Sequence, residues 1–175
     1  MPKRYTVLYM PIDAHGHVNA CLGTAQVLRD RGHRIVFAVD YAWRDILTRE
    51  GFEVELHGQE NDKEFWPQFF QKNAKYFRLS PIDTFEKFLV PIIKVMIDTH
   101  IERDSQYREI INRIKPDIIV VDNIVCSPAM INSGIPWVSQ MSANPLLYLT
   151  DKRTPPAFSG TLLRVYFQIK KAQNI

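Results

Sequence analysis

The sequence has little of what several protein classes depend on. It contains two cysteines among 175 residues, and its net charge is only +3. Cys21 and Cys126 are too few for a disulfide framework, although they are enough for one bridge, and buried free thiols in a reducing compartment are the simpler interpretation. The basic stretches, such as 29–34, are short, so the sequence lacks the concentrated positive charge of a nucleic-acid-binding protein.

Long apolar runs are missing as well. No stretch reaches the roughly 18 consecutive apolar residues that a membrane-spanning helix needs. The apolar run 5–11 near the start is too short for the core of a signal peptide with its cleavage site. We therefore expect no membrane segment in this chain and a cytoplasmic location, and any membrane anchor would have to lie outside these residues.

The residues that are present fit one globular domain. The composition is 46% hydrophobic and 23% charged, with ten Phe, seven Tyr and three Trp. A chain of this length can bury one sizeable core but is too short for two domains of ordinary size. We expect residues 1–175 to form a single domain.

Strand and helix patterns alternate through the first third of the chain. The continuous apolar run at 6–10 predicts a strand buried on both faces of a parallel sheet, and the runs at 35–39 and 52–56 predict two further strands. Helices are predicted between them, from an N-cap at Asn19 to a stop at Gly32 and over 42–49 before Gly51. Right-handed crossovers turn this alternation into an α/β fold, an open doubly wound parallel sheet that is Rossmann-like.

The alternation of strand and helix patterns is interrupted between about 58 and 104, where aromatic residues occur at helical spacing. We interpret this segment as a helical insert, with Ser80 as an N-cap and Pro91 as a kink or break. Alternation then resumes with a helix over 107–114, a strand over 117–121 that ends at Asp122, a short helix before Gly134 and a strand over 137–139. A loop over 151–160 and an amphipathic segment follow. The chain shows no helix stop before Ile175, so we expect a longer protein.

Polar residues that directly follow strands are the first candidates for chemistry, because ligands of open parallel sheets bind beyond the carboxyl ends of the strands. These residues are the His15-Gly16-His17 loop, Asp40 and Asp122. The loop has one glycine instead of G-x-G-x-x-G, which argues against a dinucleotide site. A cobalamin site would want glycine where Val18 stands. A metal site would need a third ligand beside His15 and His17, and none is evident.

His17 is the strongest candidate for a catalytic base. It precedes a predicted helix, whose positive end disfavours a charged ring and leaves the imidazole able to accept a proton. Asp122 ends a strand on the same edge of the sheet and can orient that ring. Taken singly, each residue also has a plain structural interpretation: His17 can hydrogen-bond within its loop, and Asp122 can cap the following helix.

Three segments together resemble a known family. Met10-Pro11 with Gly16-His17-Val18-Asn19, then Lys115 to Asp122, then Gly134 to Val138, resemble in the same order the N-terminal acceptor-binding domain of the UDP-glycosyltransferases of the GT-B fold. The likeness covers the chain apart from the insert. Ala20 departs from it, because the family commonly has proline there to preorganise the turn.

The resemblance implies an activity. His17 would deprotonate an acceptor hydroxyl, and Asp122 would stabilise the charged ring, in an inverting transfer of a sugar from a UDP-sugar. The base needs no metal or other cofactor. The C-terminal nucleotide-sugar domain is absent from this chain, so the chain alone should be inactive.

The acceptor is expected to be a small lipophilic molecule, because aromatic side chains of the insert can line an apolar cleft. Gly16, Asn144, Phe85 and Phe88 are the predicted substrate-binding residues. Aromatics at helical spacing are more often core residues, so we expect about a third of six aromatics in the insert to touch ligand, namely Phe65, Trp66, Phe69, Phe70, Phe85 and Phe88.

Two other functions stay open. The chain can be a non-catalytic module that binds a small ligand, a truncated or degenerate relative of such enzymes. It can also be a doubly wound sensor domain, for which no ligand dependence on His17 is expected.

Overall fold

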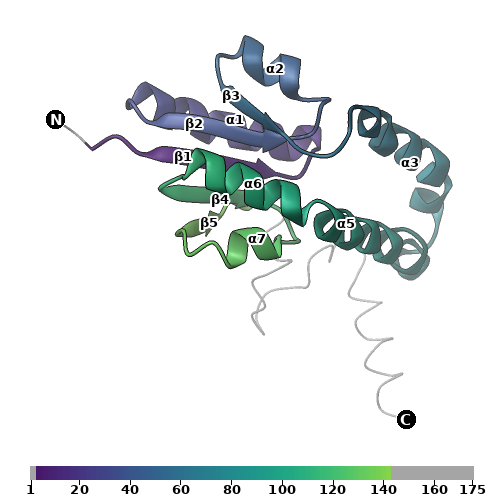
Figure 1. The fold of residues 1–175 in the computed structure, drawn as a ribbon. Coiled ribbons are helices and arrows are strands. Elements are labelled where there is room, and N and C mark those ends of the chain that lie inside the picture. The colour runs from purple at the N-terminus through teal and green to yellow at the C-terminus, as the bar shows by residue number, and fades with distance from the viewer. Residues whose placement is uncertain (1–2, 143–175) are drawn as a thin grey trace, which may run out of the picture. The chain divides into compact units, whose positions relative to one another are not determined.

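A computed structural model describes residues 3–142 of the chain (Figure 1). The strands are β1 (Thr6–Pro11), β2 (Arg34–Val39), β3 (Glu53–Leu56), β4 (Ile118–Asp122) and β5 (Trp137–Ser139). The helices are α1 (His15–Asp30), α2 (Arg44–Arg49), α3 (Phe65–Asn73), α4 (Pro81–Thr84), α5 (Val90–Glu102), α6 (Asp104–Ile114) and α7 (Pro128–Ile131). Short turns of 3₁₀ helix cover Glu60–Glu64 and Ala74–Arg78, and a π-helical turn covers Phe85–Leu89.

The strands form one parallel sheet in the order β3-β2-β1-β4-β5. The predicted α/β doubly wound fold is therefore confirmed. The sheet grows outward from β1 in both directions: β2 and then β3 lie on one side of it, and β4 and then β5 lie on the other. Ligands of open α/β sheets bind at this kind of switch point, beyond the carboxyl ends of the strands.

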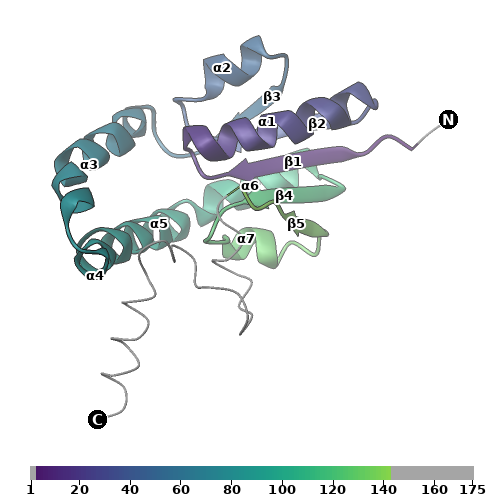
Figure 2. The ribbon, with the colours of Figure 1, turned by 180° about the vertical axis from the view of Figure 1, so that it is seen from behind.

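Each face of the sheet carries its own core. Alternate residues of the central strands, among them Val7, Tyr9 and Phe37, pack under α1 and α2 with Val18 and Leu47. The residues between them pack on the opposite face against α6 and α7, and this second core consists of Leu8, Met10, Val36, Ala38, Tyr107, Ile110, Ile111, Ile114, Ile119, Val121, Ala129 and Met130 with Cys126 and Ile135 at its margin. Figures 1 and 2 show the two layers of helices from opposite sides. Burial on both faces explains why β1, β2 and β4 are continuous apolar runs in the sequence.

Helix α1 begins earlier than the sequence predicts. It starts at His15 and not after Asn19, because the carbonyl of Ala14 already accepts hydrogen bonds from the amides of His17 and Val18. Ala14 contributes no side-chain cap, so the backbone alone sets this start. As a result, His17 lies inside the first turn of the helix and not in the loop before it.

The insert is helical, as predicted, and its central part forms a separate compact unit. The contacts group the described residues into 3–67 with 96–142 and, apart from these, 68–95. In the second unit Phe88 is buried and its ring lies 4.5 Å from that of Phe77. The π-helical turn directly precedes Pro91, because proline lacks an amide hydrogen and its ring crowds the carbonyl four residues earlier.

Strand β5 is the edge of the sheet among the described strands. It pairs only with β4 there, and all three of its residues are exposed, Trp137 by 45% and Val138 by 49%.

The structure bears on some of the remaining predictions and not on others. Cys21 and Cys126 are both free thiols, and Cys21 is buried. No helix in the described part of the chain combines the length and apolar character needed to span a membrane. Asn144, the predicted loop at 151–160 and the final amphipathic segment lie outside the described residues.

Candidate active site

Two strand ends bring His17 and Asp122 together. Asp122 is the last residue of β4 and lies beside Pro11, the last residue of β1, in the parallel register. The amide of Ile12 donates a hydrogen bond of 2.9 Å to the carbonyl of Asp122, which fixes the start of the loop into α1. Helix α1 then begins within three residues, so its first turn places His17 over the end of β4.

The imidazole and the carboxylate are in direct contact. Nδ1 of His17 lies 3.1 Å from Oδ1 of Asp122, and the side chains are 23% and 3% exposed, respectively. A carboxylate only accepts hydrogen bonds, so we assign the ring proton to Nδ1, next to Oδ1 of Asp122, which leaves a lone pair on Nε2. In this tautomer the partly exposed ring can accept a proton at Nε2 while the buried carboxylate orients it. The contact was expected from the strand ends, whereas the catalytic roles stay predictions.

Ser142 is a third member of this site that the sequence analysis missed. Its Oγ lies 2.9 Å from Nδ1 of His17, and its amide donates a hydrogen bond of 3.3 Å to Oδ1 of Asp122. Ser142 follows β5, so the rule that singled out His17 and Asp122, position just beyond a strand end, also applies to it.

One oxygen of Asp122 is buried and unpaired. Oδ2 has no hydrogen-bond partner among the described residues, although the side chain is almost fully buried. A buried polar atom without a partner costs about 1–3 kcal/mol. Such a cost is typical of functional sites, where a charged group is held for chemistry and not for stability.

The other predicted substrate-binding residues have varied surroundings. Gly16 is in the first turn of α1, and a Cβ atom there would meet no atom within 4 Å. In the separate unit 68–95, Phe85 is exposed by 54%, whereas Phe88 has the surroundings of a core residue. Asn144 lies outside the described residues. Their contacts with substrate stay predictions.

The third candidate, Asp40, is part of a turn. Its side chain is buried, and Oδ1 accepts a hydrogen bond of 2.9 Å from the amide of Ala42. Its own amide donates a bond of 2.8 Å to Oδ1 of Asp13, in the loop before α1. Asp40 thus holds the chain after β2 against the loop that leads to His17.

A buried polar network continues from Asp13 along the same edge of the sheet. Nε2 of His57 lies 3.5 Å from Oδ2 of Asp13, and Nη1 of Arg103 lies 3.1 Å from Nδ1 of His57. Arg103 also donates a hydrogen bond of 2.7 Å from Nη2 to Oδ2 of Asp62. We call Asp13, His57, Asp62 and Arg103 the edge network.

Burial shifts the protonation of this network. Desolvation, with a smaller contribution from the Arg103 cation, lowers the pKa of His57 to about 3. Desolvation raises the pKa of the Asp13 carboxyl above its ordinary value, with the Asp40 carboxyl adding to the effect. Because arginine only donates, Nδ1 of the neutral His57 is the acceptor, and the ring proton is on Nε2, which lies 3.5 Å from Oδ2 of Asp13.

The neutral state of His57 has a measurable consequence. Because the folded-state pKa is depressed from 6.5 to about 3, the unfolded chain takes up a proton at mildly acidic pH that the folded chain does not. Stability is therefore present above about pH 6.5 and is lost as the pH falls toward 3. We expect His57→Gln, which does not titrate, to lose less stability than the wild type between pH 7 and pH 4, by on the order of 3 kcal/mol in urea unfolding. Equal losses in the two proteins would show that the fold does not hold His57 neutral.

Gly58 leaves the room that Arg103 occupies within the edge network. Its φ is +75°, and an added Cβ would lie 2.7 Å from Cζ of Arg103 and 2.8 Å from Oδ2 of Asp62. We expect Gly58→Ala to lower the free energy of unfolding by at least about 2 kcal/mol, from the left-handed backbone and the overlap together. Gly32→Ala is the matched control, because Gly32 has φ +90° and open space around it. Urea unfolding of both variants measures the difference, and equal losses would contradict the close packing of Arg103.

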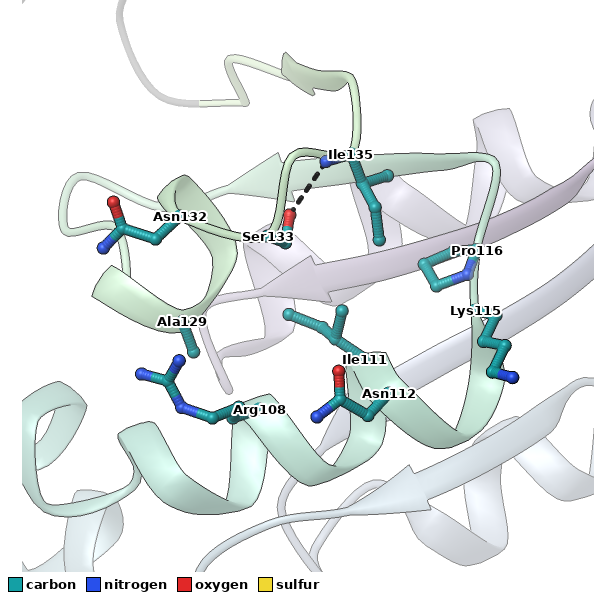
Figure 3. A pocket seen from close by; sticks show the side chains of 9 residues that line it. All are labelled: Arg108, Ile111, Asn112, Lys115, Pro116, Ala129, Asn132, Ser133 and Ile135. Atoms are coloured by element: carbon teal, nitrogen blue, oxygen red, sulfur yellow. Dashed lines mark hydrogen bonds between the residues drawn. The ribbon is translucent and has the colours of Figure 1, made fainter.

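Two cavities lie near these elements. A cavity of about 30 Å³, enough for a water molecule, adjoins the edge network and is lined by Asp13, His100, Arg103, Asn123 and neighbouring residues. A larger one of about 380 Å³ is lined by residues of α6 and α7 and of the segments before β4 and β5 (Figure 3). Neither His17 nor Asp122 lines the larger cavity, so we do not assign it to the candidate site.

Metal ligands do not cluster in the described part of the chain. No group of three or more His, Cys, Asp or Glu side chains within it is placed to hold a metal ion. The ring of His15 packs against Trp43, with 4.8 Å between ring centroids.

Comparison with known proteins places the fold. No family model matches the sequence. A curated protein named erythritol-mannosyl-transferase 1, from Pseudozyma antarctica (strain T-34), is 24% identical over 161 residues, which cover 79% of this chain and 25% of that protein. The chain therefore spans about a quarter of the length of this relative.

Solved glycosyltransferase structures also resemble this chain. The calicheamicin glycosyltransferase CalG4 is 19% identical with a TM-score of 0.60, over 93% of this chain and 37% of that one. The spinosyn rhamnosyltransferase SpnG complexed with thymidine diphosphate is 16% identical with a TM-score of 0.52, over 82% and 36%. The chain has the fold of the N-terminal part of GT-B glycosyltransferases, as its resemblance to them predicted.

Proposed function

We propose that this chain is the acceptor-binding part of a glycosyltransferase, with His17 as the base that activates the acceptor hydroxyl. The observation that carries the proposal is the contact of 3.1 Å between Nδ1 of His17 and Oδ1 of Asp122, at the carboxyl edge of a GT-B-type sheet. With the ring proton assigned to Nδ1, the lone pair of Nε2 is available to a hydroxyl, and the side chain is 23% exposed. The fold and the relatives named above support sugar transfer as the reaction.

The proposed reaction is an inverting displacement. Nε2 of His17 takes the proton of the acceptor hydroxyl, and that oxygen forms a bond to the anomeric carbon of the donor sugar. The bond between this carbon and the diphosphate breaks, and the nucleoside diphosphate leaves with the electron pair. Asp122 stabilises the imidazolium that results, because an adjacent buried carboxylate favours the charged ring. In this mechanism the base acts without a metal or other cofactor.

The donor is proposed to be a UDP-sugar, bound mainly by a C-terminal domain that is not part of these residues. One structural neighbour was solved with thymidine diphosphate, which supports a nucleoside diphosphate as the leaving group. Uracil and thymine differ by one methyl group. The choice of donor is therefore tested by comparing UDP-sugars with TDP-sugars in the same assay.

The acceptor is proposed to be a small lipophilic molecule with a hydroxyl group. Exposed aromatic side chains of the insert, such as Phe85 and Phe77, support this, because apolar ligands are held chiefly by apolar and aromatic walls. The curated relative is named for a different acceptor, erythritol, which is a small polyol. A phenol and erythritol therefore form the two arms of the acceptor test.

A cytoplasmic location remains part of the proposal.

The test begins with the coding region beyond the codon for Ile175. A protein that continues into a nucleotide-sugar-binding domain is incubated with UDP-glucose, UDP-galactose or TDP-glucose and with either acceptor. Glycosides are detected by mass spectrometry, and their anomeric configuration is determined by NMR. A glycoside of inverted anomeric configuration supports the proposal. Tight acceptor binding without any turnover would favour the non-catalytic binding module instead.

A further inference from the structure

The edge network is a group of buried and partly buried polar side chains that the proposed reaction leaves unused. Its members come from four separate parts of the chain. Asp13 follows β1, His57 follows β3, Asp62 lies in the turn after that, and Arg103 connects α5 to α6. The three side chains closest to the sheet, those of Asp13, His57 and Arg103, are at most 15% exposed.

The network is joined to the candidate site through one short loop. Residues 12–14 connect β1 to α1, and the amide of Ile12 is bonded to the carbonyl of Asp122. The carbonyl of Ala14 accepts from the amides of His17 and Val18, so it sets the first turn of the helix. Asp13 stands between these two residues, and its carboxylate is the contact between the loop and the network.

Both oxygens of Asp13 are held from outside the loop. Oδ1 accepts from the amide of Asp40, and Oδ2 faces Nε2 of His57 at 3.5 Å and Nη1 of Arg103 at 3.9 Å. Arg103 is held in turn by Asp62, whose Oδ2 also accepts a bond of 2.8 Å from the amide of Gln59. The loop therefore has one side chain that is fixed from three directions.

A buried network of this kind costs desolvation energy and so adds little to stability, while it allows only one arrangement of its hydrogen bonds. Such an arrangement matters where a side chain must be held in a narrow range of positions. Catalytic groups require this, since supporting residues have to lock them within about 0.5 Å of their working position.

We infer that Arg103 is a positioning residue, which acts through His57 and Asp13 to hold the loop 12–14 and so the ring of His17 against Asp122. The inference rests on the proposed function and deepens it, because it concerns the same base. Arg103 itself touches neither His17 nor Asp122 in any contact of the described residues. Its effect on the reaction is therefore indirect.

The experiment uses Arg103→Met and Arg103→Lys in the full-length enzyme. Methionine keeps the length of the side chain and removes the cation, and lysine keeps the cation without the two-nitrogen reach of arginine. We expect Arg103→Met to lower kcat about 10- to 100-fold with less than a threefold change in KM for the acceptor, and Arg103→Lys to recover part of the loss. Arg108→Met is the matched control, because Arg108 is an exposed arginine on α6 that pairs only with Asp104 among the described residues.

A second measurement reads the position of the ring without any turnover. The 175-residue chain is labelled with ¹⁵N-histidine, and the ring nitrogens of His17 are observed by NMR. We expect the wild type to show one tautomer with the proton on Nδ1, and Arg103→Met to show a mixture or exchange broadening. Where Arg103→Met does not fold, as its melting curve will show, Arg103→Lys is used in both measurements.

Three results would overturn the inference. One is an unchanged kcat in a folded Arg103→Met enzyme, and another is a His17 spectrum identical to that of the wild type. A raised KM with unchanged kcat would instead assign the network to acceptor binding. These outcomes are separate from a failure of the proposed function, because an enzyme that does not need His17 at all would be revealed by His17→Ala, while the NMR result would still report on the loop.

Discussion

We expect His17→Ala in the full-length enzyme to lower kcat for the proposed glycosyl transfer by at least about 1,000-fold, because the acceptor oxygen then keeps its proton as it attacks. The effect falls on kcat and on kcat/KM together, since the interaction is made only in the transition state. The protein remains folded, because the side chain is partly exposed and its backbone bonds to Ala14 do not depend on the ring.

The matched control for this variant is His15→Ala. His15 lies two residues earlier in the same helix turn and contacts Trp43 instead of Asp122. We expect transfer within a few-fold of wild type for this control. If His17→Ala retained near wild-type kcat, another group would have to be the base, and the assignment of the active site would be wrong.

The second large effect is expected for Asp122→Asn. An amide in place of the carboxylate keeps the size of the side chain but no longer favours the charged ring, and it can reverse the ring tautomer. Loss of such a carboxylate lowers kcat by about 10²- to 10⁴-fold where it orients a catalytic histidine.

The same substitution has a small expected cost in stability. Oδ2 of Asp122 is buried without a partner, so the wild-type fold already carries the cost of an unsatisfied buried oxygen. We expect the free energy of unfolding of Asp122→Asn to differ from that of the wild type by less than about 2 kcal/mol. A large loss of stability together with unchanged kcat per folded molecule would show that Asp122 is a structural cap and not part of the chemistry.

The sheet and the His17–Asp122 contact could be predicted because simple rules govern them. Apolar runs such as 35–39 mark buried parallel strands, and the carboxyl ends of those strands meet at one edge. His17 and Asp122 stand directly beyond two such ends. Ser142 stands beyond a third, and its contact with the ring was within reach of the same rule.

Other features could not be derived in this way. The start of α1 depends on the carbonyl of Ala14, and a backbone cap leaves no mark in the sequence, whereas Asn19 looks like a side-chain cap. The edge network joins Asp13 and His57 to Arg103, which is 46 residues further along the chain than His57. Its contacts depend on the approach of α5 and α6 to the sheet, and no periodic pattern encodes that approach.

The short strand β5 has a practical consequence for anyone who produces these residues. Among the described residues, the side chains of Trp137 and Val138 are exposed, and the outer edge of β5 pairs with no strand. An unpaired edge is a template for another strand, either from the same protein or from a second copy. Self-association at high concentration is therefore the first thing to check in any preparation of these 175 residues, and dilute conditions are preferable for their spectroscopy.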